Sequence, residues 1–152
     1  MFTNLRKLTG PMTIVIAESD VGLRYTLWRL LRADKHRVIA TRNGEEALKV
    51  MRSVAVPVDF VIADFDTPAM DGLELCRCIA KEHPEIRVLL ISDGVTGIDE
   101  IQRAGLPFIS KPFTAFAIRR RIEAVLQQGG VLSHADNEAD RLVGSGEPDC
   151  RD

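Results

Sequence analysis

Five polar residues follow short apolar runs in this sequence, and together they could handle a phosphoryl group. Glu18 and Ser19 follow the first such run, Asp64 and Ser92 follow two later ones, and Lys111 follows the last. Carboxylates can hold a hard cation or act as nucleophiles, and an ammonium and a hydroxyl can stabilise charged oxygens. Each residue alone has an ordinary explanation as a helix cap or turn residue. Their shared position after an apolar run is what indicates phosphoryl chemistry.

The segment from Asp59 to Gly72, DFVIADFDTPAMDG, is the most informative part of the chain. Its apolar run from Phe60 to Ala63 stops abruptly at Asp64. Strands of parallel sheets are covered on both faces and read as continuous apolar runs, and ligands bind outside their carboxyl ends. The segment therefore predicts a buried strand that presents Asp64 at a ligand-binding edge.

Short apolar strands and helical patterns alternate along the chain. The predicted strands are 14–17, 37–41, 60–63, 88–91 and 108–110, and the helical patterns cover about 23–31, 44–51, 73–83, 98–104 and 114–128. Helical spacing of leucines, a break before proline, a closing glycine and a capping threonine mark the helices. Five such units with right-handed crossovers predict a three-layer α/β domain built on a parallel sheet.

Length and composition limit the domain organisation. The 152 residues, 45% of them hydrophobic, suit one domain with a sizeable core. We expect an N-terminal extension at 1–11, the folded domain at 12–128, and a flexible tail at 129–152, because periodicity ends at Gly129 and the tail is rich in Gly, Ser, Asp and Glu.

Charge and hydropathy exclude several functional classes. A net charge of -2 argues against a dominant nucleic-acid or anionic-membrane surface, and the one basic cluster, Arg119 to Arg121, is interpreted as a solvated helix face, with a partner-docking patch as the alternative. The sequence has no apolar stretch of about 18 residues and no secretory leader, so a cytoplasmic location is expected. No cysteine and histidine spacing predicts a zinc site.

The polar residues also form a recognisable set. The acid at Glu18, Asp64 followed by Pro68, Met70, Asp71 and Gly72, then Ser92 and Lys111-Pro112-Phe113 resemble the receiver domain of bacterial response regulators over about residues 12–128. The resemblance implies a flavodoxin-like fold, a doubly wound parallel sheet with strand order 2-1-3-4-5. It also implies a signalling phosphoprotein that is not an enzyme beyond its own phosphorylation and dephosphorylation.

By this resemblance, Asp64 is the phosphoacceptor in a two-component or phosphorelay system. It would take a phosphoryl group from a phosphohistidine on a histidine kinase or histidine phosphotransfer protein. Lys111 would pair with phosphoryl oxygens, Ser92 would hydrogen-bond to one of them, and Phe108 matches the switch aromatic. The Lys111-Pro112 bond is expected to be cis.

The same resemblance implies a Mg²⁺ cofactor and protein partners. Glu18, Asp64 and the backbone carbonyl of Asp66 would bind Mg²⁺, with Ser19 or Asp20 contributing through water. Besides the kinase, a downstream protein target is expected, with no nucleic-acid or membrane partner, and the protein would be a monomer or a weak homodimer.

Two positions depart from the family's pattern. Ser19 stands where the family has a second acid, which removes an anionic ligand, and Asp93 stands where a small uncharged residue is usual. These departures leave open a degenerate receiver that acts as a phosphorylation-independent binding module.

A third interpretation comes from a different class of protein. Asp64 and Asp66 also resemble the nucleophile and acid/base of haloacid dehalogenase-like phosphatases. Such enzymes need a further acidic pair after the lysine, and only Glu123 lies between Lys111 and Gln128.

Overall fold

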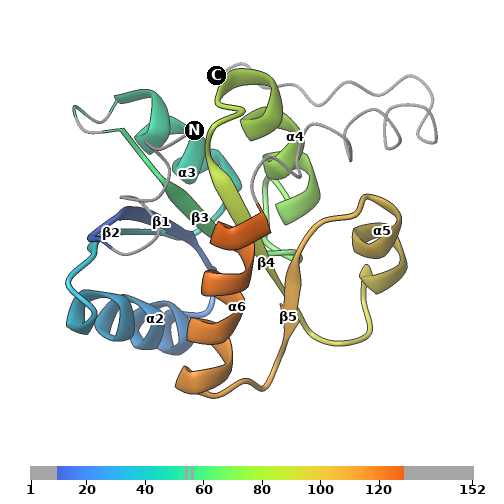
Figure 1. Ribbon diagram of the computed structural model, residues 1–152. Helices are drawn as coiled ribbons and strands as arrows, with labels where there is room; N and C mark the ends of the chain where they lie inside the picture. The colour runs from blue at the N-terminus through green and yellow to red at the C-terminus, as the bar shows by residue number, and fades with distance from the viewer. Residues whose placement is uncertain (1–9, 54, 56, 129–152) are drawn as a thin grey trace.

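The protein folds as a five-stranded parallel sheet between two layers of helices (Figure 1). The computed structural model describes residues 10–128 except 54 and 56. The strands are β1 (Thr13–Ala17), β2 (Arg37–Thr41), β3 (Phe60–Asp64), β4 (Arg87–Ser92) and β5 (Phe108–Ser110). They pair in the order β2-β1-β3-β4-β5, which is the order that the family resemblance implies.

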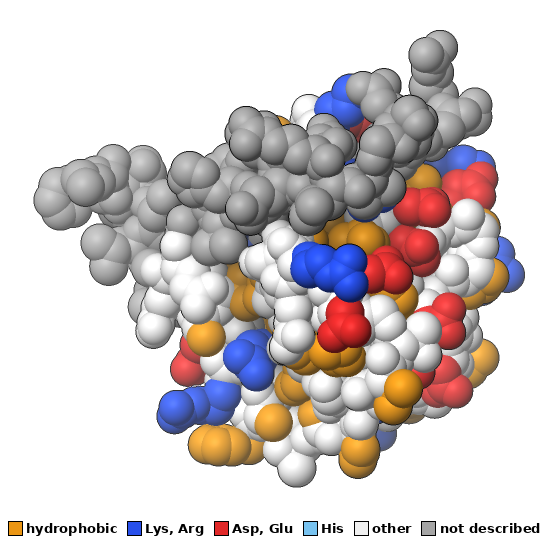
Figure 2. All heavy atoms as spheres, turned by 90° about the vertical axis from the view of Figure 1, so that its right-hand side faces the viewer, with side chains coloured by type: hydrophobic (Ala, Val, Ile, Leu, Met, Phe, Trp, Pro, Cys, Tyr) orange, Lys and Arg blue, Asp and Glu red, His pale blue; other side chains and the backbone are white. Residues whose placement is uncertain are grey.

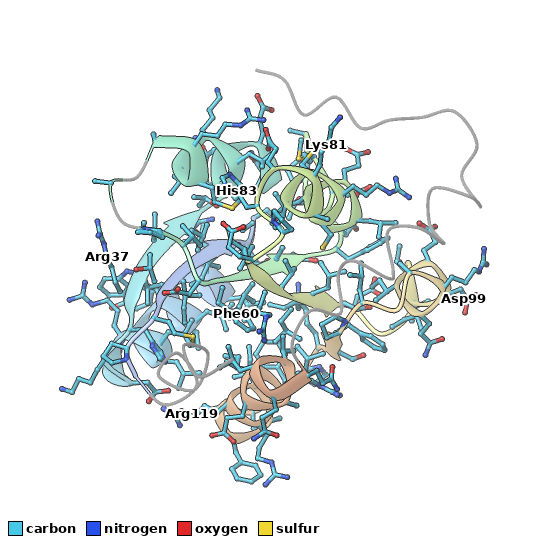
Figure 3. All side chains as sticks on the ribbon, turned by 45° about the horizontal axis from the view of Figure 1, so that its top comes forward. Arg37, Phe60, Lys81, His83, Asp99 and Arg119 are labelled. Atoms are coloured by element: carbon cyan, nitrogen blue, oxygen red, sulfur yellow. The ribbon has the colours of Figure 1, made fainter. Side chains whose placement is uncertain are left out.

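Two hydrophobic layers hold the helices against opposite faces of the sheet. The helices are α2 (Val21–Ala33), α3 (Gly44–Ser53), α4 (Gly72–Glu82), α5 (Ile98–Arg103) and α6 (Ala115–Gln128). One layer packs α2 and α6 against Ile14, Phe60 and Ile91, with Phe60 near the middle of the sheet (Figure 3). The other packs α3, α4 and α5 against Val15, Val61 and Leu90. Alternate residues of each central strand thus face different layers, so these strands are apolar throughout.

Side-chain caps fix where four of the helices begin, and at the start of α3 the cap is Asn43 Oδ1, which accepts a hydrogen bond from Glu46 N at 2.9 Å. Asp20 accepts a hydrogen bond from Leu23 N at 2.7 Å, Asp71 from Glu74 N at 2.8 Å, and the Thr114 hydroxyl from Ala117 N at 3.0 Å. Such a cap satisfies an amide that has no partner within the helix. Two of the caps directly follow the segments that contain Glu18 and Asp64, so they also fix the loops of the candidate site.

The predicted strands and helices are confirmed, and every end lies within two residues of its predicted position; the largest differences are that α2 runs from Val21 to Ala33 and that α3 extends to Ser53. The predicted tail at 129–152, and residues 1–9 of the predicted N-terminal extension, lie outside the described residues. No helix in the described part of the chain is long and apolar enough to span a membrane.

Candidate functional site

Asp64 lies at the carboxyl end of β3, in the centre of the sheet. Its neighbours are β1 and β4, and the residue is only 5% exposed. Its Oδ1 accepts a hydrogen bond from Asp66 N at 3.0 Å, which holds the carboxylate against the loop that follows. A buried carboxylate needs a compensating charge or donor, and the structure supplies one from the far edge of the sheet.

Lys111 provides that charge. It follows β5 directly, and its Nζ lies 2.7 Å from Asp64 Oδ2 and 3.8 Å from Glu18 Oε1. The Lys111-Pro112 peptide is cis, as expected, and Lys111 N donates to Ser92 O at 2.8 Å. The predicted convergence of three residues from the ends of β1, β3 and β5 is therefore present in the structure.

Glu18 is the most unusual group of the site. It is 1% exposed, its Oε1 accepts a hydrogen bond from Asp20 N at 3.1 Å, and its Oε2 is buried without a hydrogen-bond partner among the described residues. Burial, followed by the hydrogen bond and negative charge of Asp64, raises the pKa of Glu18 to about 7. Ionising this carboxylate is costly unless a positive charge approaches it.

The surroundings of Lys111 favour its charged form, whereas those of Glu18 favour its neutral form. Burial works to lower the pKa of Lys111, but the hydrogen bond to Asp64 and the charges of Glu18 and Asp64 outweigh it and raise the pKa. Lys111 therefore stays protonated, and a single ammonium faces two carboxylates. The negative charge of the two carboxylates is therefore not fully neutralised, and one more cation could bind there.

The donor set fits Mg²⁺. Within the described residues no cluster of three or more His, Cys, Asp or Glu side chains could hold a metal. However, Mg²⁺ binds through one or two carboxylates and keeps several waters. Glu18 and Asp64 supply two carboxylates at adjacent strand ends, and the free Oε2 of Glu18 is an oxygen that a cation would satisfy.

Ser19 and Asp20 lie at the exposed rim of this site. The carboxylate of Asp20 is already engaged as the cap of α2. Arg24, which the sequence analysis missed, donates from Nη1 to the carbonyl oxygens of Glu18 at 2.8 Å and Ser19 at 3.3 Å. An arginine in the first turn of a helix that follows a candidate site is the sequence signal that could have suggested it. Arg24 fixes the backbone that presents Glu18.

Ser92 and Phe108 occupy neighbouring strands. Ser92 is fully buried, and its Oγ accepts a hydrogen bond from Gly94 N at 3.0 Å. It lies one residue beyond Ile91, the register partner of Asp64. Phe108 is half-buried, faces Leu90 in the register, and packs against the layer that contains α5. The Ser92 hydroxyl thus joins the strand end beside Asp64 to the loop that leads into α5.

The exposed carboxylate of Asp93 is held by the backbone of the loop that follows it. Its Oδ1 accepts hydrogen bonds from Val95 N at 2.8 Å and Thr96 N at 2.7 Å, and these bonds lower the pKa of its exposed carboxyl. The residue shapes the turn between β4 and α5 while keeping a negative charge near Lys111. The sequence analysis identified the charge but not the turn.

Phe65 links the site to the same loop. It directly follows Asp64, is 8% exposed, and its ring covers Gly97, where a Cβ atom would lie 2.1 Å from Phe65 Cε1. Gly97 has φ of 76°, in the left-handed region that favours glycine, and it precedes α5. The sequence gives no signal for this contact, because the two residues meet only in the folded sheet.

Sequence comparisons find related proteins. The profile of the response regulator receiver domain matches residues 14–123. The response regulator GtcR of Aneurinibacillus migulanus is 31% identical over 130 residues, which cover 84% of this chain and 52% of GtcR. The sensor kinase CckA of Brucella abortus is 29% identical over 126 residues, which cover 80% of this chain and 13% of CckA. The chain thus spans about half of GtcR and a small part of CckA.

Solved structures share the fold. The chemotaxis protein CheY4 of Vibrio cholerae superposes with a TM-score of 0.68 at 17% identity, covering 76% of this chain and 99% of CheY4. The response regulator TrrA of Thermotoga maritima, solved in complex with Mg²⁺ and BeF, has a TM-score of 0.67 at 22% identity, covering 75% of this chain and 98% of TrrA. At these identities the superpositions establish the fold alone.

Proposed function

Because this chain belongs to the response regulator receiver domain family, we propose that it is a phosphoacceptor of a two-component or phosphorelay system. Asp64 takes the phosphoryl group from a phosphohistidine on a histidine kinase or a histidine phosphotransfer protein. The observation that carries the proposal is the meeting of Asp64, Glu18 and Lys111 at one edge of the sheet, with Lys111 Nζ 2.7 Å from Asp64 Oδ2.

The reaction needs little beyond positioning and charge neutralisation. An oxygen of Asp64 forms the new bond to phosphorus while the phosphorus–nitrogen bond to the donor histidine breaks, and the electron pair leaves with the imidazole. Asp66 N and Lys111 orient the carboxylate, and Lys111 neutralises charge on the phosphoryl oxygens. Mg²⁺, when bound, supplies further neutralisation of those oxygens.

Several residues of this chain would together bind Mg²⁺. Glu18 and Asp64 contribute carboxylates, Asp66 its backbone carbonyl, and Ser19 or Asp20 a water-mediated contact. Arg24 donates a hydrogen bond to the carbonyl oxygen of Glu18 and so fixes the backbone that presents this carboxylate. The lack of an acid at position 19 leaves a weaker site than two acids would give.

Phosphorylation is read out through Ser92 and Phe108. A phosphoryl group on Asp64 attracts the Ser92 hydroxyl, which now accepts a hydrogen bond from Gly94 N. Movement of Ser92 and the β4–α5 loop lets Phe108 turn inward and remodels the surface of α5, β5 and α6. This is a population shift between two states.

The proposal extends to organisation and partners. Residues 12–128 form the receiver domain, and its partners are the phosphodonor and a downstream protein rather than a nucleic acid. The family consists of signalling proteins, and the chain would catalyse nothing beyond its own phosphorylation and dephosphorylation. It would act as a monomer or a weak homodimer.

Beryllofluoride, which mimics a phosphoryl group, tests the proposal in a backbone NMR titration with Mg²⁺. We expect shifts around residues 18, 64, 92–97 and 108–111 in the wild type. The matched variants are Asp64→Asn, which should abolish the shifts, and Asp66→Asn, which keeps the backbone carbonyl and should retain them. A wild type that gives no shifts would refute phosphoacceptor function and favour a phosphorylation-independent binding module.

A further inference from the structure

The two helical layers carry different charge. Helix α2 contains three arginines and no acidic residue, and α6 contains three arginines and one glutamate. Helices α3 and α4 each carry two acidic and two basic residues, and α5 carries two acids and one arginine. Acidic side chains gather over the side of the molecule that carries α5 (Figure 2). The layer of α2 and α6 is therefore a basic surface on a chain of net negative charge.

Two aromatic rings of α2 lie within this basic layer: Tyr25 is exposed, and Trp28 is half-buried against the core. Tyr25, 57% exposed, and Trp28 stack with ring centroids 6.1 Å apart and an angle of 16° between their planes. The guanidinium of Arg29 lies 5.8 Å from the Tyr25 ring centroid, and that of Arg32 lies 5.0 Å from the Trp28 ring centroid. We call these four residues of α2 the basic aromatic face. Planar cations backed by rings are well suited to bind carboxylates.

A cavity lies between the C-terminal end of α2, the side of α6 and residues 10–12. Its volume is about 520 Å³, and it is lined by Leu31 and Lys35 near the end of α2 and by Ile122 and Leu126 of α6. Arg119, labelled in Figure 3, joins the two helices through an ion pair to Asp34, with Nε 2.8 Å from Oδ2. Leu126, two residues before the end of α6, lines this cavity together with Leu31 and Lys35.

The segment after α6 has the composition to cover both features. Gly129 and Gly130 come first, then Val131 and Leu132, and the acidic stretch from Asp136 to Asp140 follows. Residues 129–152 contain six acidic residues and two arginines. Eight residues of extended chain reach about 27 Å, whereas α2, with 13 residues, is about 20 Å long.

We propose that residues 131–140 of this chain dock on α2 of the same molecule. Val131 and Leu132 enter the cavity between α2 and α6, and the acidic stretch pairs with Arg29 and Arg32 on the basic aromatic face. The docked segment lies along the helix that follows Glu18, so any protein that approaches α2 must first displace it.

Because residues 131–140 belong to the same chain as α2, even weak contacts are sufficient to keep them docked. A short flexible link gives an effective concentration on the order of 1 mM, so a segment with an intrinsic Kd of about 0.1 mM would be docked roughly 90% of the time. Because the contacts are mainly between exposed charges, added salt weakens them.

Trp28 provides a direct probe, because it is the only tryptophan in the chain. The test variant is Asp136→Asn/Glu138→Gln/Asp140→Asn in the full chain, and the matched control, Glu147→Gln/Asp149→Asn/Asp152→Asn, removes the same charge outside the docking segment. We expect the test variant to shift Trp28 emission to the red and to move the amide resonances of α2. Raising salt should do the same in the wild type, and the control should leave both signals unchanged.

Three results would overturn the proposal. The first is identical spectra for the wild type and the test variant. The second is an equal change in the control, which would make the effect one of net charge. The third is a signal that varies with protein concentration, which would place the segment on a second copy of the chain. Arg29→Gln/Arg32→Gln tests the same contact from the helix side and should make salt and the tail variant ineffective.

Discussion

Gly97→Ala probes the contact that ties the residue after Asp64 to the start of α5. A Cβ atom at position 97 would lie 2.1 Å from Phe65 Cε1 and 2.2 Å from Cζ, so the buried ring must move. Gly97 also has φ of 76°, where an alanine is strained whatever the space. Gly94 is a natural control, because its φ is 91° but a Cβ there would meet only Ser110 Cβ at 3.9 Å.

The expected destabilisation is the sum of two effects. The left-handed backbone costs an alanine about 1–2 kcal/mol, and forcing a methyl group into a packed contact costs a further 1–3 kcal/mol or so. Gly97→Ala should therefore lower the free energy of unfolding by about 2–5 kcal/mol. Gly94→Ala should lower it by the backbone part alone, about 1–2 kcal/mol.

Urea denaturation of both variants measures the difference. Phe65→Leu removes the ring atoms nearest the added methyl, so in that background Gly97→Ala should cost less by at least about 0.5 kcal/mol, the lower end of coupling between contacting residues. Equal destabilisation by Gly97→Ala and Gly94→Ala, together with no coupling to Phe65, would refute the contact and its part in linking Asp64 to α5.

Three other substitutions test separate parts of the account. Ser19→Asp should tighten Mg²⁺ binding roughly tenfold, as 1.4 kcal/mol of added attraction would, and unchanged calorimetric titrations would remove the missing acid as the cause of a weak site. Asp93→Ala should lower the free energy of unfolding, because Val95 N and Thr96 N lose their acceptor, and should change the lifetime of phospho-Asp64; if both quantities stay as in the wild type, neither the turn that Asp93 forms nor its charge matters. His36 accepts a hydrogen bond from Met12 N, and burial lowers the pKa of His36 from 6.5 despite the nearby charge of Asp34. The unfolded chain therefore binds a proton at His36 more readily than the folded protein does. As a result, the free energy of unfolding should fall as the pH drops below about 6.5. His36→Gln should reduce this loss of stability in urea melts measured at a series of pH values. An unchanged dependence of the free energy of unfolding on pH would contradict the role given to His36.

The strand ends could be predicted because burial on both faces leaves a strong sequence signal. Asp64 follows four apolar residues of a central strand, and Lys111 follows the short strand Phe108–Ser110, so each marks an edge of the sheet independently of the other. The strand order was supplied by the resemblance to a family, since alternating strands and helices fit several orders. The meeting of Asp64 and Lys111 across β4 depends on that order.

Other features depend on contacts that sequence spacing does not encode. Arg119 pairs with Asp34 across 85 positions, whereas the arginine cluster was interpreted as a solvated face, with a partner-docking patch as the alternative. Phe65 and Gly97 meet because β3 and β4 are neighbours, and the unpartnered oxygen of Glu18 is defined by what surrounds it. Such contacts require the relative placement of elements, which local propensity does not give.

Reaction with acetyl phosphate and Mg²⁺, followed by intact-protein mass spectrometry, tests the phosphoacceptor assignment most directly. The wild type and Asp66→Asn should each gain the mass of one phosphoryl group, whereas Asp64→Asn, or wild type treated with a chelator, should gain none. A phosphoryl group that appears equally on Asp64→Asn, or fails to appear on a folded wild type, would contradict the account.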